Sequence, residues 1–237
     1  MIGVKDIRLA VDRLLAREQR GSTVSPSDFN RFLEIANAME FSGVAKMLEA
    51  NADITDMVKS LYKETYKTPD ETGVVTLPTD CYKVLGVLAG SKPVDRVSYL
   101  EYSEIKNNSI AQPTTDYPVY YIREGQLIVD PILSQSLRIG YVKDINTPYL
   151  DYYINGQKNI VYLDEGETVD ESLIDGDFMN YGNDGSPITI SNGLYTSQTV
   201  ELEWDRNENR VNILNNVLRL CGISEKVNIN TTGYEEE

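Results

Sequence analysis

The chain has 237 residues, of which 41% are hydrophobic and 25% charged, a composition typical of a globular protein with one sizeable core or two small ones. It contains no histidine, which excludes Ser-His-Asp and Cys-His catalysis, histidine general bases and zinc sites with histidine ligands. The longest uncharged apolar stretch, residues 84–90, is far shorter than the roughly 20 residues of a membrane span, and charges begin at Lys5. The sequence therefore predicts neither a membrane protein nor an ordinary signal peptide.

The net charge of −15 is concentrated in the last third of the chain. Residues 1–67 hold 10 basic and 10 acidic side chains, residues 68–143 hold 7 and 9, and residues 144–237 hold 5 and 18. Binding to nucleic-acid phosphates needs a basic surface, so this distribution argues against affinity for DNA. The excess acid fits either a surface that repels nucleic acid or an ordinary solvated acidic face.

The first 67 residues have the apolar spacing of helices. A first helix is predicted from one apolar stripe: Val4, Ile7, Val11 and Leu14. Gly21 is expected to follow its C-terminus, as glycine does at the end of many helices. A third, shorter helix is predicted after residues 51–53, with inward positions at Ile54, Met57, Val58 and Leu61.

The second helix has the clearest start. Ser25 is a good N-cap, Pro26 fits the first helical position, and Asp28 places an acid in the first turn. Its predicted inward positions are Phe29, Phe32, Leu33, Ala36, Met39, Val44 and Met47. One amphipathic helix cannot bury its stripe alone, so the helices are expected to pack together or against a sheet.

From residue 68 the apolar period changes to that of strands. Strands are predicted at residues 74–77, 82–88, 119–122, 127–129, 137–142, 152–154, 160–162, 188–190 and 200–204. Hairpins are expected at Arg123-Glu124-Gly125-Gln126, with the glycine at positive φ, and at Asn155-Gly156, a pair that favours tight turns. Residues 97–105 are expected to form one or two helical turns, and the acidic stretch 163–186 a loop or mobile insertion.

A last helix is predicted over residues 206–221, capped by Asp205 and followed by Gly222. Its apolar face is expected to hold Val211, Leu214, Leu218 and Cys221. The predicted fold class is therefore α+β, with an N-terminal helical bundle packed on a small antiparallel β domain. The expected regions are residues 1–67 for the helices, 68–205 for the β domain with an acidic insertion at about 144–197, and 206–237 for the closing helix and an extended tail.

No motif assembles a catalytic, cofactor-binding or metal site. The stretch around Asp175 and Asp177 resembles a calcium loop, but Met179 and Asn180 stand where a third ligand and a glycine are required. A solvated turn-rich loop is favoured there over an irregular calcium site. Phosphate loops, nucleophile elbows and dinucleotide fingerprints are missing, and no carboxylate pair is singled out for glycoside hydrolysis. We therefore expect a protein that is not an enzyme and needs no cofactor.

The two cysteines, Cys81 and Cys221, each lie among apolar residues. This favours buried thiols in a reducing compartment, with a long-range disulfide as the alternative. Two cysteines without histidine cannot complete a tetrahedral zinc site.

Tyrosine is unusually frequent, with 16 tyrosines against 4 phenylalanines. Tyrosine suits half-exposed sheet faces and protein interfaces, where the ring is buried and the hydroxyl group stays in water. A carbohydrate-binding platform would use the same residues, but usually with more than the one tryptophan of this chain. A protein interface is therefore favoured.

Five segments form an ordered pattern: residues 25–30 (Ser-Pro-Ser-Asp-Phe-Asn), 75–84 with Leu-Pro-Thr-Asp inside, 118–131, 137–141 and 200–205. In this order they resemble a helix start, a strand entry, a hairpin, a further strand, and the closing strand and helix of the head-to-tail adaptor (connector) proteins of tailed bacteriophages. The pattern is most similar to a ring protein of crAss-like podoviruses. The acidic stretch 144–197 has no counterpart in it.

The resemblance implies a structural virion protein. Such adaptors form a ring of 12 copies that docks on the portal and extends the DNA channel toward the tail. The implied partners are further copies of the chain, the portal protein, other tail or ring proteins, and passing DNA bound without specificity. The implied location is the head–tail junction of the virion, with the host cytoplasm during assembly.

The tail from residue 224 is expected to dock on a neighbouring subunit, because related adaptors extend a C-terminal arm toward the portal. The brief alternation of Val227, Ile229 and Thr231 suits strand addition, and Tyr234 is an aromatic anchor of the kind enriched at interfaces. A frayed terminus is the alternative. For the whole chain, the rival class is an extracellular or surface β module that binds carbohydrate or protein.

Overall fold

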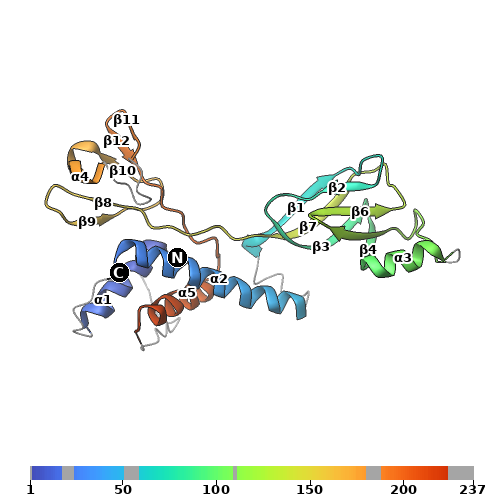
Figure 1. The fold of residues 1–237 in the computed structure, drawn as a ribbon, viewed down its shortest axis with the longest axis horizontal. Helices are drawn as coiled ribbons and strands as arrows, with labels where there is room; N and C mark the ends of the chain where they lie inside the picture. Colours follow the sequence, from blue (N-terminus) through green and yellow to red (C-terminus); the bar gives the residue numbers. More distant parts are fainter. Residues whose placement is uncertain (1, 18–23, 51–58, 109–110, 180–187, 224–237) are drawn as a thin grey trace, which may run out of the picture. The chain divides into compact units, whose positions relative to one another are not determined.

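The chain folds into two compact units, which the computed structural model describes over residues 2–17, 24–50, 59–108, 111–179 and 188–223 (Figure 1). We call residues 1–50 with 145–237 the helical unit, and residues 51–144 the sheet unit. The division falls at residues 50 and 144, whereas the sequence led us to expect boundaries at 67 and 205. The expected α+β class is confirmed, with helices, a curled seven-stranded sheet and smaller sheets.

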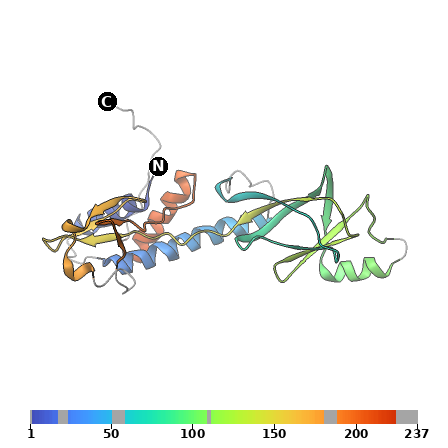
Figure 2. The same cartoon turned by 90° about the horizontal axis from the view of Figure 1, so that it is seen from above.

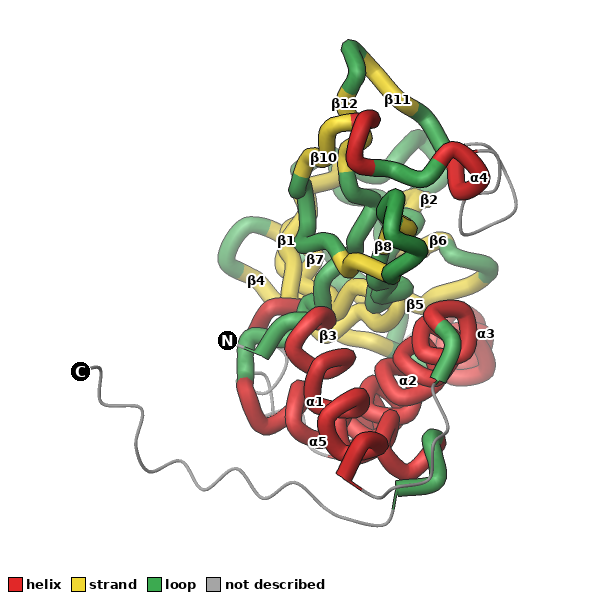
Figure 3. The backbone as a smooth tube through the Cα atoms, turned by 90° about the vertical axis from the view of Figure 1, so that its left-hand side faces the viewer, coloured by secondary structure: helices red, strands yellow, loops and turns green. Residues whose placement is uncertain are grey.

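Three helices organise the helical unit: α1 (Val4–Arg17), α2 (Pro26–Ala50) and α5 (Asn207–Leu220). α5 packs against both α2 and α1 (Figures 2 and 3, where Figure 3 draws helices in red). The predicted start of α2 is confirmed, since the Asp28 backbone N–H donates to the Ser25 hydroxyl at 3.1 Å. The predicted end of α5 is confirmed as well. Gly222 has a φ of 79°, and the Ile223 N–H donates to the Leu218 carbonyl at 2.9 Å.

The inward faces of the helices differ from the predicted stripes at several positions. Met39 and Met47 of α2 were expected to be buried but are 40% and 50% exposed. In the same part of the helix, Phe41 and Ala45 are buried instead. In α1, Leu15 is buried while Leu14 is only half-buried. The helical period alone does not fix which residue of a neighbouring apolar pair turns inward, because the packing partners decide it.

The start and face of α5 also differ from the prediction. Its N-cap is Arg206 rather than Asp205, and no side chain caps it. Val211 and Cys221 are half-buried, whereas Arg210 is buried beside Ile213 and Val217. The face is rotated because Arg210 binds backbone carbonyls: Nε donates to Trp204 at 2.6 Å, Nη2 to Leu202 at 2.9 Å, and Nη1 to Ile2.

Two asparagines of α2, Asn30 and Asn37, hold extended segments against the helix. The Asn30 amide donates to the Leu150 carbonyl at 3.1 Å and accepts from the Leu150 N–H at 2.9 Å. The Asn37 amide donates to the Asn146 carbonyl at 3.1 Å and accepts from Trp204 Nε1 at 2.8 Å. Residues 146–150 and Trp204 are thereby fixed on α2. Residues 200–204 were predicted as a strand, but they make only the isolated bridge between Val200 and Tyr149 among the described residues.

The region after residue 145 contains the two strands predicted at 152–154 and 160–162, and the expected loop at 163–186 is wrong over its described part, residues 163–179, which holds a strand and two short helices. It contains the hairpin β8 (Tyr152–Ile154) and β9 (Ile160–Tyr162), and the sheet β10 (Thr168–Asp170), β12 (Leu194–Thr196) and β11 (Ile190–Ser191), with short helices η2 (Glu171–Leu173) and α4 (Gly176–Met179). Its core holds Tyr153, Leu163, Val169, Ile174 and Tyr195. The predicted hairpin at Asn155-Gly156 is confirmed. However, its loop spans residues 155–159, and Lys158 takes the positive φ of 62°.

A buried carboxylate ties these small sheets together. Asp151 is fully buried and accepts hydrogen bonds from the Tyr195 hydroxyl, the Gln198 N–H at 2.8 Å and the Tyr152 N–H at 2.9 Å. Burial and this hydrogen bond raise the pKa of Tyr195 well above its ordinary value, so the phenol remains a donor.

The sheet unit is built on seven strands in the order β1-β7-β3-β4-β5-β6-β2. They are β1 (Tyr62–Lys67), β2 (Val74–Thr76), β3 (Cys81–Ala89), β4 (Lys92–Arg96), β5 (Val119–Arg123), β6 (Gln126–Asp130) and β7 (Leu137–Lys143). Neighbours are antiparallel except β4 and β5, which are joined by the helix α3 (Tyr99–Asn107). The core contains Val84, Val87, Tyr120, Leu127, Leu137 and Ile139 among others.

The predicted helical region up to residue 67 is wrong at its end, because residues 62–67 form β1. This strand pairs along its whole length with β7, from Tyr62 opposite Val142 to Lys67 opposite Leu137. β1 is mostly exposed on both faces, so it has none of the apolar alternation that marks a strand in a sequence. β4 was also missed. Of the predicted third helix, Ile54, Met57 and Val58 lie outside the described residues, as does Gly21.

The hairpin predicted over residues 123–126 is confirmed, with a loop of only Glu124 and Gly125. β5 and β6 pair up to Arg123 opposite Gln126, and Glu124 and Gly125 both have positive φ, at 52° and 75°. Two positive φ values in a two-residue loop match the twist of paired strands.

None of the helices in the described part of the chain has the length and apolar character that crossing a membrane requires.

We predict that Asn37→Ala lowers the free energy of unfolding by about 3 kcal/mol, because it leaves the buried indole N–H of Trp204 and the Asn146 carbonyl without partners. Urea titration followed by tryptophan fluorescence measures this. Asn212→Ala, at an exposed asparagine of α5, should change stability by less than about 0.5 kcal/mol. Equal effects of the two variants would contradict the role given to Asn37.

Candidate docking surface

The docking residues predicted from the sequence, Val227, Ile229 and Tyr234, lie outside the described residues. The described part instead contains a groove on the sheet unit that the sequence did not predict. The groove has a volume of about 480 Å³. Its lining comes from β1, β3, β4 and β7: Tyr62, Glu64, Leu85, Gly86, Val87, Leu88, Pro93, Val94, Arg138 and Gly140.

The groove exists because two glycines face each other on neighbouring strands. Gly86 of β3 is paired with Gly140 of β7, so two adjacent positions lack side chains. The register shifts between Val84 and Gly86, which makes Leu85 the extra residue of a β-bulge. The bulge brings Leu85 to the groove beside Gly86, and Leu88 and Pro93 add further apolar surface.

One end of the groove carries a hydrogen-bonded ion pair. Arg138 donates to Glu64 from Nε at 2.9 Å and from Nη2 at 2.5 Å, and the Tyr62 hydroxyl donates to Glu64 at 2.7 Å. These two donors, Arg138 first, hold the pKa of the Glu64 carboxyl below its ordinary value. The groove lining therefore combines apolar side chains with a fixed polar pair, which suits an amphipathic ring such as tyrosine.

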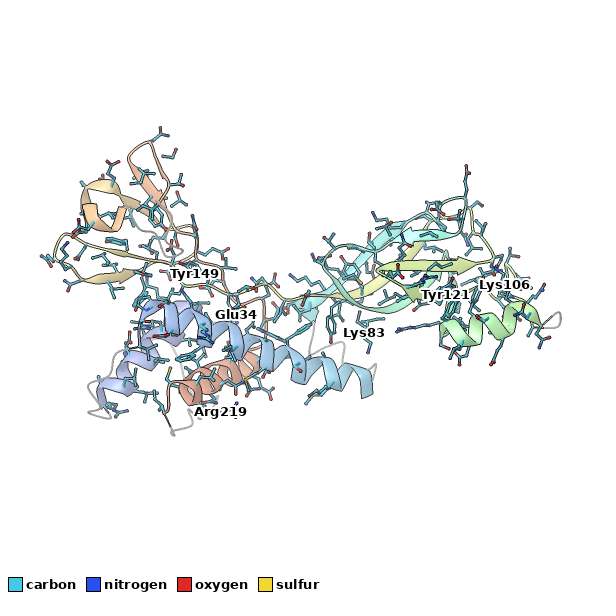
Figure 4. All side chains as sticks on the ribbon, in the orientation of Figure 1. Glu34, Lys83, Lys106, Tyr121, Tyr149 and Arg219 are labelled. Carbon is cyan, nitrogen blue, oxygen red and sulfur yellow. The ribbon has the colours of Figure 1, made fainter. Side chains whose placement is uncertain are left out.

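A second surface of the sheet unit is rich in tyrosine. The Tyr121 ring lies 4.6 Å from that of Tyr102 and 5.7 Å from that of Tyr99, measured between centroids. The Tyr102 hydroxyl donates to Asp130 at 2.8 Å, and the Lys106 ammonium donates to that hydroxyl at 2.9 Å (Tyr121 and Lys106 are labelled in Figure 4). Burial raises the pKa of Tyr102. Tyr102 is thus held inside, while Tyr99 stays 56% exposed.

The calcium-like stretch is organised around a lysine. The Lys158 ammonium lies 2.7 Å from Asp175 and 3.1 Å from Asp177, and its hydrogen bond lowers the pKa of Asp175. Asn180, which stands where a calcium loop requires a glycine, is outside the described residues. Within the described ranges, no three acidic or cysteine side chains are grouped as metal ligands would be. A lysine between the two carboxylates supplies the positive charge that a cation would otherwise bring.

Both cysteines are free thiols. Cys81 and Cys221 are each half-buried rather than fully buried as expected, and burial raises the pKa of both. A raised pKa keeps a thiol protonated and weakly nucleophilic at neutral pH.

Comparison of the chain with models of protein families gives no match, and neither does comparison with curated protein sequences.

We predict that Gly140→Ala lowers the melting temperature by about 3 °C, because its Cβ would lie 2.8 Å from the Tyr62 hydroxyl oxygen and displace that ring. Gly86→Ala is the matched control, since its Cβ meets nothing within 4 Å. The fall in melting temperature caused by Gly140→Ala should be smaller when Tyr62 is replaced by phenylalanine. An equal fall in the Tyr62→Phe protein would show that contact with the Tyr62 hydroxyl is not the cause.

Proposed function

We propose that this chain is a head-to-tail adaptor, a structural virion protein that forms a ring beneath the portal, extends the DNA channel and links capsid to tail. The observation that carries the proposal is the agreement between the resembling segments and the elements of the chain. Residues 25–30 begin α2, residues 77–80 lead into β3, and residues 118–131 span the β5–β6 hairpin. Residues 137–141 lie in β7, so four of the five segments coincide with the type of element found there in the adaptor pattern, which supports the proposal. Residues 200–205 lead into α5 without forming the expected strand.

The proposed partners are 12 copies of the chain in the ring, the portal protein, and other tail or ring proteins. DNA passes without specific binding, which the net charge of −15 favours. The proposal includes packing of the N-terminal helices on the antiparallel β unit in the assembled ring. It places the protein at the head–tail junction, and in the host cytoplasm during assembly. No catalytic step is assigned to it.

The second candidate is a surface module that binds carbohydrate or protein through exposed aromatic rings. It draws on Tyr99 and Tyr117, which are 56% and 77% exposed. Stacking on a sugar would require such rings to stay uncovered in the working state, whereas a ring subunit would cover them with neighbouring chains.

Electron microscopy of assembled virions tests the proposal. We expect density for this chain in a ring with rotational symmetry between portal and tail. Virions in which the chain is missing from that junction, or present there without rotational symmetry, would refute the adaptor function. Binding to a glycan array by the purified chain would favour the surface module instead.

We predict that deleting residues 224–237 leaves the melting temperature within about 2 °C, because α5 is already closed at Gly222 and Ile223. Incorporation into particles should fall, because the tail is proposed to dock on a neighbouring subunit. Differential scanning calorimetry and the protein content of purified particles measure the two effects. Normal incorporation would make the segment a dispensable tail, and unfolding would make it part of its own core.

A further inference from the structure

The groove between β1, β3, β4 and β7 is open at Gly86, whereas the Tyr62 ring, which is part of its lining, covers Gly140. The Cβ of a side chain at Gly86 would meet nothing within 4 Å. Ligand pockets of proteins have volumes of roughly 300–1,000 Å³, and the groove, at about 480 Å³, lies in that range. It can therefore receive a large side chain together with part of the segment that carries it.

We propose that the groove receives the C-terminal segment, residues 224–237, of a second copy of this chain, with Tyr234 inserted as the anchor. The inference rests on the proposed ring function, because a ring is built from one surface of each copy that fits a different surface of the next. It names the contact that would join neighbouring copies.

Tyr234 matches the chemistry of the groove. A tyrosine buries about 150–250 Å² and keeps a hydroxyl group that needs a polar partner. Leu85, Leu88 and Pro93 offer apolar surface to the ring, and the Glu64–Arg138 pair offers partners for the hydroxyl. Tyr234 is the only aromatic residue after Trp204 in the sequence.

The strand beside the groove offers backbone partners to the rest of the segment. In the sheet order of the described residues β1 is the last strand, and β7 lies along one of its edges. An extended segment can add to such an edge, with alternate side chains on one face. Val227, Ile229 and Thr231 have that alternation.

Charge favours the same pairing. The four strands around the groove carry seven Lys or Arg and two Asp or Glu, in a chain with a net charge of −15. Three of these positive charges are in ion pairs, Lys63 with Asp80, Lys92 with Asp116 and Arg138 with Glu64. The segment 224–237 has four glutamates and one lysine. Opposite charges on two surfaces of one chain attract successive copies head to tail.

The length of the segment allows it to reach a neighbour. It starts after Ile223, which is buried next to the end of α5. Fourteen residues can extend up to about 50 Å, which is more than the diameter of a small domain. The anchor can therefore lie on a different subunit from the helix that leads to it.

Site-specific photocrosslinking tests the contact in the full chain. Tyr234 is replaced by p-benzoylphenylalanine, and ¹⁴N- and ¹⁵N-labelled copies are mixed at high protein concentration and low salt. We expect crosslinked peptides that combine the two labels and map to residues 85–94. Crosslinks confined to a single copy, crosslinks elsewhere, or none at all would overturn the proposal.

A matched pair of glycine variants sharpens the test. Gly86→Leu fills the groove and should lower the crosslink yield about tenfold, as expected for loss of a buried aromatic anchor. Gly156→Leu adds the same side chain in the β8–β9 loop, where a Cβ also meets nothing within 4 Å, and should leave the yield unchanged. An equal yield in both variants counts against the groove as the receptor.

The outcome is separable from that of the proposed function. If the crosslinks form but virions carry no ring of this chain at the head–tail junction, the adaptor function fails and the contact between copies stands. If the ring is present but Tyr234 crosslinks to the portal protein rather than to residues 85–94, the function stands and the groove contact fails.

Discussion

The helical unit depends on two amide side chains spaced two turns apart on one helix. Asn30 and Asn37 of α2 pair with backbone groups of residues 146–150 and with the indole of Trp204, all of which come from distant parts of the chain. An amide donates and accepts at once, so each asparagine satisfies two buried groups that would otherwise cost free energy. Once Trp204 is fixed, its carbonyl and that of Leu202 are held by Arg210, which links α5 to the same extended segment.

The sheet unit obeys a different constraint, in which missing side chains matter as much as present ones. Its groove needs Gly86 opposite Gly140, and it needs the bulge that brings Leu85 to the outer face. A regular strand would have placed a side chain over the same spot. The helical unit thus buries polar groups that secure long-range contacts, whereas the sheet unit keeps a groove lined in part by apolar side chains.

The parts of the fold that local chemistry specifies were predictable. Ser25 and Pro26 mark the start of α2, Glu124-Gly125 the β5–β6 turn, and Gly222 the end of α5, because each requirement lies within a few residues. The strand β1 was not predictable from the sequence, since its residues are mostly polar and it forms a strand by pairing with β7. The groove was not predictable either, because the pairing of Gly86 with Gly140 depends on the register between β3 and β7, which the sequence does not show. The burial of Asn37 depends on partners that are 109 and 167 residues away.

The pairing of Tyr62 with Val142 has a consequence for how the chain reaches its native state. The chain enters the sheet unit through β1 and leaves it through β7, and these two strands are adjacent. A folded sheet unit therefore holds residues 62 and 142 close together. Closing the contact from Asn37 to Asn146 then spans an effective loop of roughly 30 residues instead of 109, which reduces the entropy cost by about 1 kcal/mol. A folded sheet unit therefore lowers the entropy cost of docking residues 146–150 on α2, so the inserted unit assists the folding of the unit that surrounds it in sequence.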